Sequence, residues 1–238
     1  MQPNIVYTPQ QISALSNEVI THIGSECALS AAGDVWCWGM GNDGRIGDGD
    51  LGHEPLPKKV PGLSGVRSLC GSWGGNPRFA ILQNGDVYAW GRNADGRLGN
   101  GYTQNVATPE KVLELQGFVE FFSGHASFGR KADGSTYVWG DNTLGDFGDG
   151  TTGMGTSTPV RAPQADDFVY IYSGSLAVDS SGQVWVSGNN RSSLTNFGLL
   201  GLGHNNEVLS PEKLGGIKAL PRGYTAITGS TGGVLRTP

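Results

Sequence analysis

The sequence has little basic charge and no long apolar run. Its 238 residues carry 16 Lys and Arg against 21 Asp and Glu, which gives a net charge of −5, and no basic cluster stands out. The electrostatic footprint of a nucleic-acid-binding protein is therefore missing. No stretch is apolar for the roughly 20 residues that span a bilayer. We expect no nucleic-acid partner and no membrane span.

The first ten residues, MQPNIVYTPQ, lack the basic and apolar regions of a secretory signal. Unless a signal has been removed, this favours a protein of the cytoplasm or one assembled on a particle surface. Localisation stays open between the two.

Signatures of catalysis and metal binding are also missing. The histidines at positions 22, 53, 125 and 204 show no zinc-binding spacing, and no G-x-S-x-G nucleophile elbow occurs. The glycine-rich loops are not followed by G-K-[ST], which a phosphate-binding loop requires. We predict no catalytic residue, no metal and no cofactor, and hence a protein that is not an enzyme.

One acidic loop has two interpretations. Asn42, Asp43, Asp48 and Asp50 offer oxygen atoms that suit a calcium ion, but the order D-x-[DN]-x-[DN]-G is not met. Asn and Asp are also common turn residues because their side chains bond to nearby backbone. We favour the turn role.

Cysteine is scarce, with three in the chain: Cys27, Cys37 and Cys70. An odd count without a C-x-x-C pair is not typical of a disulfide framework. We interpret all three as small buried apolar residues. A bridge between Cys27 and Cys37 within one hairpin is the alternative.

Glycine is abundant, with 40 residues, and it marks a repeat. Residues 85–101 read GDVYAWGRNADGRLGNG, and related segments stand at 33–49, 134–150 and, more loosely, 182–203. The first glycines, at positions 33, 85, 134 and 182, are separated by 52, 49 and 48 residues. Such a period indicates a repeat architecture in which each unit buries its faces against its neighbours.

Proline repeats with a similar period. Prolines at positions 9, 57, 109, 159 and 211 each lead into a short strand-like segment, as proline does at the start or edge of a strand. They divide the chain into five repeats, at approximately residues 5–55, 56–107, 108–157, 158–209 and 210–238. We expect these repeats to form one domain over residues 1–238.

Each repeat also predicts a hairpin. Asn-Gly or Asp-Gly between apolar runs is a strong hairpin signal. In the strand that follows, Trp36 and Trp38 share one face while Val35 and Cys37 share the other. Both faces are apolar, so neighbouring copies must cover them, as in a radial stack of antiparallel sheets. The predicted fold is an all-β propeller of about five blades built from repeats of ~50 residues.

The fifth repeat predicts strands at 224–227 and 233–235 and ends before a glycine loop, whereas the first repeat begins at Thr8-Pro9. We expect the N-terminal segment to complete the last blade and to close a monomeric ring. The rival is an arc whose ends are covered by another chain, as part of a larger assembly.

The loop pattern W-G-x-N-x-x-G-x-L-G-x-G, which residues 90–101 match throughout, resembles the repeat of the regulator of chromosome condensation family. The resemblance covers nearly the whole chain. It implies a β-propeller, usually of seven blades where this chain has five repeats. Members of that family include a guanine-nucleotide exchange factor, ubiquitin-ligase modules and a secreted bacterial inhibitor of β-lactamase. No position here matches an exchange-catalysing residue.

Two insertions break the repeat. The glycines at 71 and 85 are 14 residues apart, against 9 and 10 in the neighbouring repeats, and those at 188 and 198 are 10 apart, against 5 elsewhere. The predicted binding residues lie in these insertions: Trp73, Asn76, Arg78, Arg191, Leu194, Asn196 and Phe197. Alternatively, Trp73 packs back on its own blade, and Leu194 or Phe197 fills the volume lost where Ser187 replaces a tryptophan.

These observations favour a non-enzymatic propeller that binds a protein partner through its inter-strand loops. A structural or adhesive protein of a virion or other surface assembly is one alternative. A regulator similar to a guanine-nucleotide exchange factor is the other. The fold alone decides between none of them.

Overall fold

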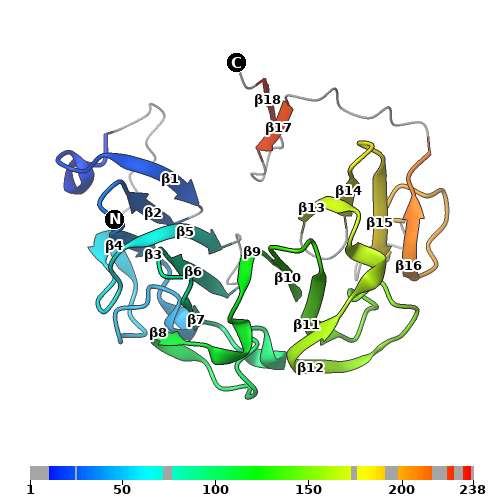
Figure 1. The fold of residues 1–238 in the computed structure, drawn as a ribbon, viewed down its shortest axis with the longest axis horizontal. Helices are drawn as coiled ribbons and strands as arrows, with labels where there is room; N and C mark the ends of the chain where they lie inside the picture. Colours follow the sequence, from blue (N-terminus) through cyan, green and yellow to red (C-terminus); the bar gives the residue numbers. More distant parts are fainter. Residues whose placement is uncertain are drawn as a thin grey trace, which may run out of the picture.

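The computed structural model describes residues 11–24, 26–71, 77–172, 176–190, 198–215, 224–227 and 233–236. Four antiparallel sheets of four strands, here called blades 1 to 4, follow one another along the chain (Figure 1). Blade 1 contains β1 (Ile20–Gly24), β2 (Cys27–Ser30), β3 (Val35–Gly39) and β4 (Glu54–Lys59). Blade 2 contains β5 (Val66–Gly71), β6 (Arg78–Leu82), β7 (Val87–Gly91) and β8 (Val106–Lys111).

Blade 3 contains β9 (Phe118–Ser123), β10 (Ala126–Lys131), β11 (Thr136–Asn142) and β12 (Gly153–Arg161). Blade 4 contains β13 (Phe168–Tyr172), β14 (Leu176–Asp179), β15 (Val184–Gly188) and β16 (Val208–Lys213). The described helices are short 3₁₀ turns: η1 (Ser13–Leu15), η2 (Asn42–Gly44), η3 (Ala94–Gly96), η4 (Leu113–Leu115) and η5 (Pro163–Ala165). Among the described residues, no helix is long and apolar enough to cross a membrane.

The blades are arranged around an arc. The first strands of successive blades contact one another, β1 with β5, β5 with β9 and β9 with β13, so they form the inner side of the arc (Figure 1). The fourth strands pair only with the third strands of their own blades and form the outer edges. This is the up-and-down blade of a β-propeller, and the predicted fold class is confirmed.

The last two strands form a separate hairpin. β17 (Tyr224–Ile227) pairs with β18 (Gly233–Arg236), with Tyr224 opposite Arg236. These are the strands predicted for the fifth repeat. The N-terminal segment that we expect to complete that blade lies outside the described residues, as do residues 216–223.

Both faces of the blades are covered, as the alternating strands predict. On β7, Val87 and Ala89 on one face and Trp90 on the other are all 0% exposed. Trp90 lies against the loop of the preceding blade, because a Cβ placed on Gly47 would fall 2.6 Å from its Nε1. Aromatic side chains of one blade thus pack on small residues of its neighbour, and one core cluster extends through blades 1 to 3.

The interpretation of the cysteines as separate thiols is wrong for one pair. Cys27 lies directly opposite Cys37 in the β2–β3 ladder, and the two form a disulfide with their Cα atoms 4.1 Å apart. The hairpin register brings them together, since opposite residues of an antiparallel pair alternate between a wider and a closer spacing and this pair has the closer one. Cys70 is a free, partly buried thiol, and burial raises its pKa to about 11.

Candidate protein-interaction face

Strand direction places two kinds of connection on one face of the arc, here called the loop face. In each antiparallel blade, the turn between the first and second strands and the long loop between the third and fourth strands lie at the same end. The first insertion joins the described structure at Gly71 and Arg78, and the second joins it at Asn190 and Gly198. The described residues that flank the two insertions therefore lie on the loop face.

A buried asparagine organises each regular loop. The Oδ1 of Asn93 accepts a hydrogen bond from the N–H of Leu98 (2.8 Å), and its Nδ2 donates to the carbonyl of Tyr102 (3.0 Å). Asn142 and Asn190 hold their own loops in the same way. The loops therefore have a defined shape although they lack regular secondary structure.

The apolar residue that follows in each loop is buried, as the pattern predicts. Ile46, Leu98 and Phe147 are 1%, 0% and 6% exposed. They anchor the loop in the core beneath it, as the sequence pattern of an apolar residue before a tight glycine turn indicates.

Each loop is also fixed to the next blade by a backbone hydrogen bond. The N–H of Gly49 donates to the carbonyl of Ala107 (2.9 Å), and Gly101 donates to Ser157 in the same way (3.0 Å). The third such bond joins the N–H of Gly150 to the carbonyl of Leu209 (2.7 Å). The loop face is thus a platform in which neighbouring blades are tied together.

Blade 1 departs from the asparagine pattern. Gly41 occupies the position of Asn93, and its N–H donates to Nδ1 of His53 (3.2 Å). A Cβ on Gly41 would fall 1.5 Å from the carbonyl oxygen of Gly52, so only glycine fits here. In this loop the backbone itself fills the space that the asparagine side chain fills elsewhere.

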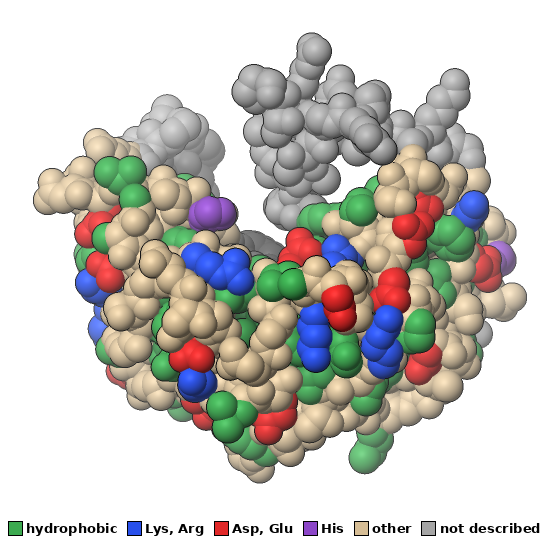
Figure 2. Space-filling model, viewed as in Figure 1, with side chains coloured by type: hydrophobic (Ala, Val, Ile, Leu, Met, Phe, Trp, Pro, Cys, Tyr) green, Lys and Arg blue, Asp and Glu red, His purple; other side chains and the backbone are tan. Residues whose placement is uncertain are grey.

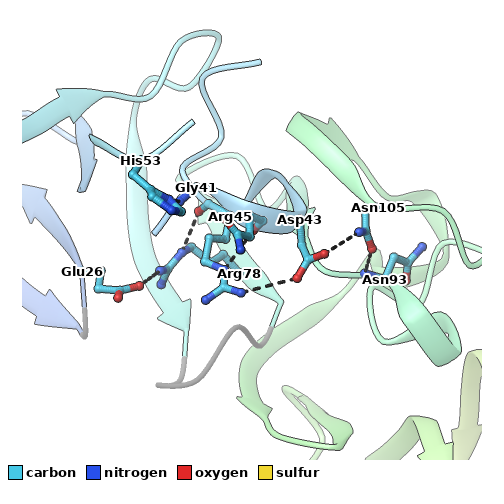
Figure 3. A network of polar contacts seen from close by, with 9 residues as sticks. Glu26, Gly41, Asp43, Arg45, His53, Arg78, Asn93 and Asn105 are labelled. Carbon is cyan, nitrogen blue, oxygen red and sulfur yellow. Dashed lines mark hydrogen bonds and ion pairs between the residues drawn. The ribbon is translucent and has the colours of Figure 1, made fainter. Parts of the chain in front are cut away.

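A polar network crosses the joint between blades 1 and 2 (Figure 3). Arg78 at the start of β6 is 3% exposed; its Nε donates to the carbonyl of Arg45 (2.9 Å) and its Nη2 to Oε2 of Glu26 (3.2 Å). Burial lowers the pKa of Arg78 to about 10, and the carboxylate of Glu26 opposes that effect. Arg78 thus joins the loop of blade 1 to the end of the first insertion.

The network continues outward through Asp43, which adopts a positive φ of 64°. Its Oδ2 lies 3.4 Å from Nη2 of Arg45, and its Oδ1 accepts a hydrogen bond from Nδ2 of Asn105 (2.9 Å). The Oδ1 of Asn105 in turn accepts the N–H of Asn93 (2.8 Å) (Figure 3). Polar side chains of blade 1 therefore fix the loop of blade 2.

The other acidic residues of this loop form turn and ion-pair contacts. Oδ1 of Asp48 accepts the N–H of Asp50 (3.0 Å), and Oδ2 of Asp48 lies 2.6 Å from Nζ of Lys58. Oδ1 of Asp50 accepts the N–H of Leu51 (2.6 Å). Within the described ranges, no three His, Cys, Asp or Glu side chains gather as a metal site would require.

A matching network crosses the joint between blades 2 and 3. Arg97 is 6% exposed, and its Nη2 lies 3.0 Å from Asp95 and 3.7 Å from Asp141. Its carbonyl accepts hydrogen bonds from Oγ of Ser127 (2.8 Å) and Nε1 of Trp139 (2.9 Å). In both loops, the arginine immediately before the buried apolar residue thus connects its blade to the next one: Arg45 connects blades 1 and 2, and Arg97 connects blades 2 and 3.

Large apolar side chains are exposed on the loop face. Leu51, Tyr102 and Met154 are 60%, 39% and 90% exposed, and each belongs to the connection between the third and fourth strands of its blade or to its end. The Tyr102 hydroxyl donates to Glu110, and burial together with that carboxylate raises the pKa of Tyr102 to about 12. These side chains expose apolar area on the loop face.

Charges of both signs are interspersed on the face that Figure 2 shows, rather than gathered by sign. Several of the chain's charges are paired across strands, such as Lys59 with Asp34 (2.6 Å) and Lys111 with Asp86 (2.8 Å). That face therefore has no single-sign field that would attract a polyanion.

Of the predicted binding residues, the structure describes Arg78, which is buried beneath the loop face. The others lie outside the described residues: Trp73, Asn76, Arg191, Leu194, Asn196 and Phe197. The packing alternatives for Trp73, Leu194 and Phe197 lie outside them as well. Sequence reasoning missed Glu26 and Arg45, although an arginine before the apolar residue in two repeats was a visible signal.

Comparison with known proteins agrees with this architecture. The model of the regulator of chromosome condensation (RCC1) repeat matches residues 32–76 and 84–127. The chain is 37% identical over 119 residues to human E3 ubiquitin-protein ligase HERC2. This alignment covers 45% of this chain and 2% of HERC2. It is 33% identical over 115 residues to the Arabidopsis thaliana ultraviolet-B receptor UVR8, covering 46% of this chain and 26% of the receptor.

Solved structures share the fold at low sequence identity. Human WBSCR16 aligns with a TM-score of 0.59 at 20% identity, over 85% of this chain and 53% of that one. Yeast RCC1 (Prp20), solved bound to Kap60, aligns with a TM-score of 0.60 at 20% identity, over 81% of this chain and 48% of that one. This chain thus spans about half of these solved proteins and a smaller share of the curated relatives. The chain is a β-propeller protein in which residues 32–76 and 84–127 match the RCC1 repeat.

Proposed function

We propose that this propeller acts without catalysis, by binding another protein through its loop face. The observation that carries the proposal is that both insertions that break the repeat join the structure on this one face. Exposed Leu51, Tyr102 and Met154 lie on the same face. A rigid platform with variable loops is a common arrangement for recognition.

Within this proposal the insertions supply the contacts. Trp73 and Phe197 are the aromatic anchors, because buried aromatic residues carry much of the energy of protein interfaces. Asn76, Arg191, Leu194 and Asn196 supply the surrounding contacts. Arg78 acts from beneath the loop face, since its buried guanidinium donates to Glu26 and to the carbonyl of Arg45. It positions the end of the first insertion.

The relatives support a binding role in general terms. Yeast RCC1 was solved bound to the protein Kap60, and a second structure of that protein is described with its binding properties to Gsp1p and histones. These partners belong to the yeast protein. What they support for this chain is the use of the same fold to hold a protein.

Replacing Trp73 with alanine is expected to weaken partner binding at least tenfold while leaving the melting temperature nearly unchanged. Truncation of a hot-spot aromatic residue typically costs about 2 kcal/mol or more. A partner is first identified by crosslinking and mass spectrometry, and its affinity for the wild type and the variant is then measured by calorimetry.

The matched control is Leu113→Ala. Leu113 is 70% exposed in the connection from β8 to β9, at the end of the blade opposite the loop face. Its truncation should leave affinity unchanged. If Leu113→Ala weakens binding and Trp73→Ala does not, the contact lies on the other face and the proposal fails. If Trp73→Ala lowers affinity and melting temperature together, Trp73 packs on its blade instead.

A further inference from the structure

The joint between blades 3 and 4 differs from the two joints before it. At the regular joints, Arg45 and Arg97 precede the buried apolar residue of the loop. A tryptophan of the next blade packs on the glycine that follows that apolar residue. A Cβ on Gly99 would fall 2.7 Å from Nε1 of Trp139, which shows how closely the blades approach. The arginine and the tryptophan together fill the joint.

At the third joint both residues are different. Asp146 occupies the position that Arg45 and Arg97 occupy in the earlier loops. Ser187 occupies the position of Trp90 and Trp139 in the blades that follow those loops. A Cβ on Gly148 would lie 3.5 Å from Oγ of Ser187, an ordinary contact distance rather than a clash. The joint has therefore exchanged a cation for an acid and lost a large aromatic side chain at the same place.

The carboxylate of Asp146 is buried without a full set of partners. Asp146 is 1% exposed, and among the hydrogen bonds of the described structure its Oδ2 has none. The Nδ1 of His125, whose side chain is 58% exposed, lies 3.9 Å from that oxygen. An ionised carboxylate in such a place is costly, because burial removes its water and no hydrogen bond within the described residues compensates at Oδ2.

The surrounding charges only partly offset this cost. Burial raises the pKa of Asp146 to about 6; His125 and Arg97 act to lower it, and Asp141 acts to raise it further. These are the charged groups that act on Asp146 from β11, from the turn between β9 and β10 and from the loop of blade 2. None of them is within hydrogen-bond distance of Oδ2.

We propose that the loop of blade 3 that contains Asp146 is a proton-responsive element of the propeller, which is stabilised when the buried carboxylate of Asp146 takes up a proton and destabilised when it releases that proton. A proton on Asp146 removes the buried charge and so makes the folded conformation of this loop more favourable. This inference is independent of the proposed binding role.

The sign of the effect follows from linkage. The pKa of Asp146 in the folded protein, about 6, is above its ordinary value of 3.8, so the folded state binds the proton more tightly than the unfolded state. The stabilisation is fully present at pH values below 3.8, the pKa of Asp146 in the unfolded chain, and it is lost as pH rises through 6. Between pH 8 and pH 5 the folding equilibrium constant should therefore gain roughly tenfold from this group.

The test is urea unfolding of the full chain between pH 5 and 8, for wild type and Asp146→Asn. The asparagine cannot ionise. The ratio of the folding equilibrium constant of Asp146→Asn to that of wild type should therefore fall roughly tenfold from pH 8 to pH 5. His125→Gln removes a group that favours the carboxylate, so its pH midpoint should lie above that of wild type. Asp149→Asn, in the same loop, should keep the wild-type pH dependence.

If the difference in the free energy of unfolding between Asp146→Asn and wild type does not change with pH, the proposal is overturned. If that variant does not fold, the carboxyl-carbon NMR titration of wild type still decides. A step for Asp146 near pH 6, moved upward in His125→Gln, supports the proposal, and a step below pH 5 overturns it.

Discussion

Replacing Trp90 with alanine is expected to lower the free energy of unfolding by about 3–5 kcal/mol, as large-to-small changes of buried aromatic residues do. Trp90 is 0% exposed and lies between β7 and the loop of blade 1 that contains Gly47. Its Nε1 has no hydrogen-bond partner among the described residues, so the loss is one of packing and not of a polar contact.

Urea unfolding of the two proteins measures this loss, with Leu113→Ala as the control. Leu113 is 70% exposed, and its truncation should change stability by less than about 0.5 kcal/mol. A loss below about 1 kcal/mol for Trp90→Ala would show that Trp90 is not buried between blades.

Replacing Gly96 with alanine is expected to be much more destabilising than replacing Gly117. Both glycines have a positive φ, 75° and 85°, so both variants carry a similar backbone strain of about 1–2 kcal/mol. A Cβ on Gly96 would also fall 2.4 Å from Cα of Ser157 in blade 3, whereas nothing lies within 4 Å of a Cβ on Gly117. The clash should add roughly 1–3 kcal/mol, because backbone atoms of two blades must separate.

The comparison isolates the contact between blades, since the strain of a positive φ cancels between the two variants. The melting temperatures of both are measured by calorimetry under one set of conditions. Equal losses for Gly96→Ala and Gly117→Ala would mean that the loop of blade 2 does not pack against β12.

The second and third strands of the blades were predictable because local chemistry marks them. Asn84-Gly85 and Asp133-Gly134 set tight turns, and the alternation of Val87, Tyr88, Ala89 and Trp90 fixes which side chains share a face. The hairpin formed by β17 and β18 followed from the same signals. These features depend on neighbours in sequence, which a pattern of residues records directly.

The first strand of each blade was not predicted. β1, β5, β9 and β13 read ITHIG, VRSLCG, FVEFFS and FVYIY, so they share no motif that a comparison of repeats would detect. They lie on the inner side of the arc, where their contacts are with the first strands of other blades. Such contacts are set by the packing of neighbouring blades and not by a local turn.

The disulfide and the position of Arg78 show a similar limit. Counting three cysteines argued against a bridge, yet the turn at Gly33 sets the register that places Cys27 opposite Cys37. Arg78 stood in an insertion, where an arginine is expected to be exposed. The structure buries it because Glu26, 52 positions earlier, supplies a carboxylate across the joint, and sequence separation hides such a pair.

Light scattering of the purified chain tests most directly whether the described arc closes into a five-bladed ring. We propose that the β17–β18 hairpin forms the middle of the fifth blade and that this blade covers Val19 and Ile23, which are 72% and 77% exposed at the end of blade 1. A closed ring predicts a monomer near 24.9 kDa, and removal of residues 1–11 should lower its melting temperature. A stable oligomer that loses solubility when diluted to monomers would contradict closure.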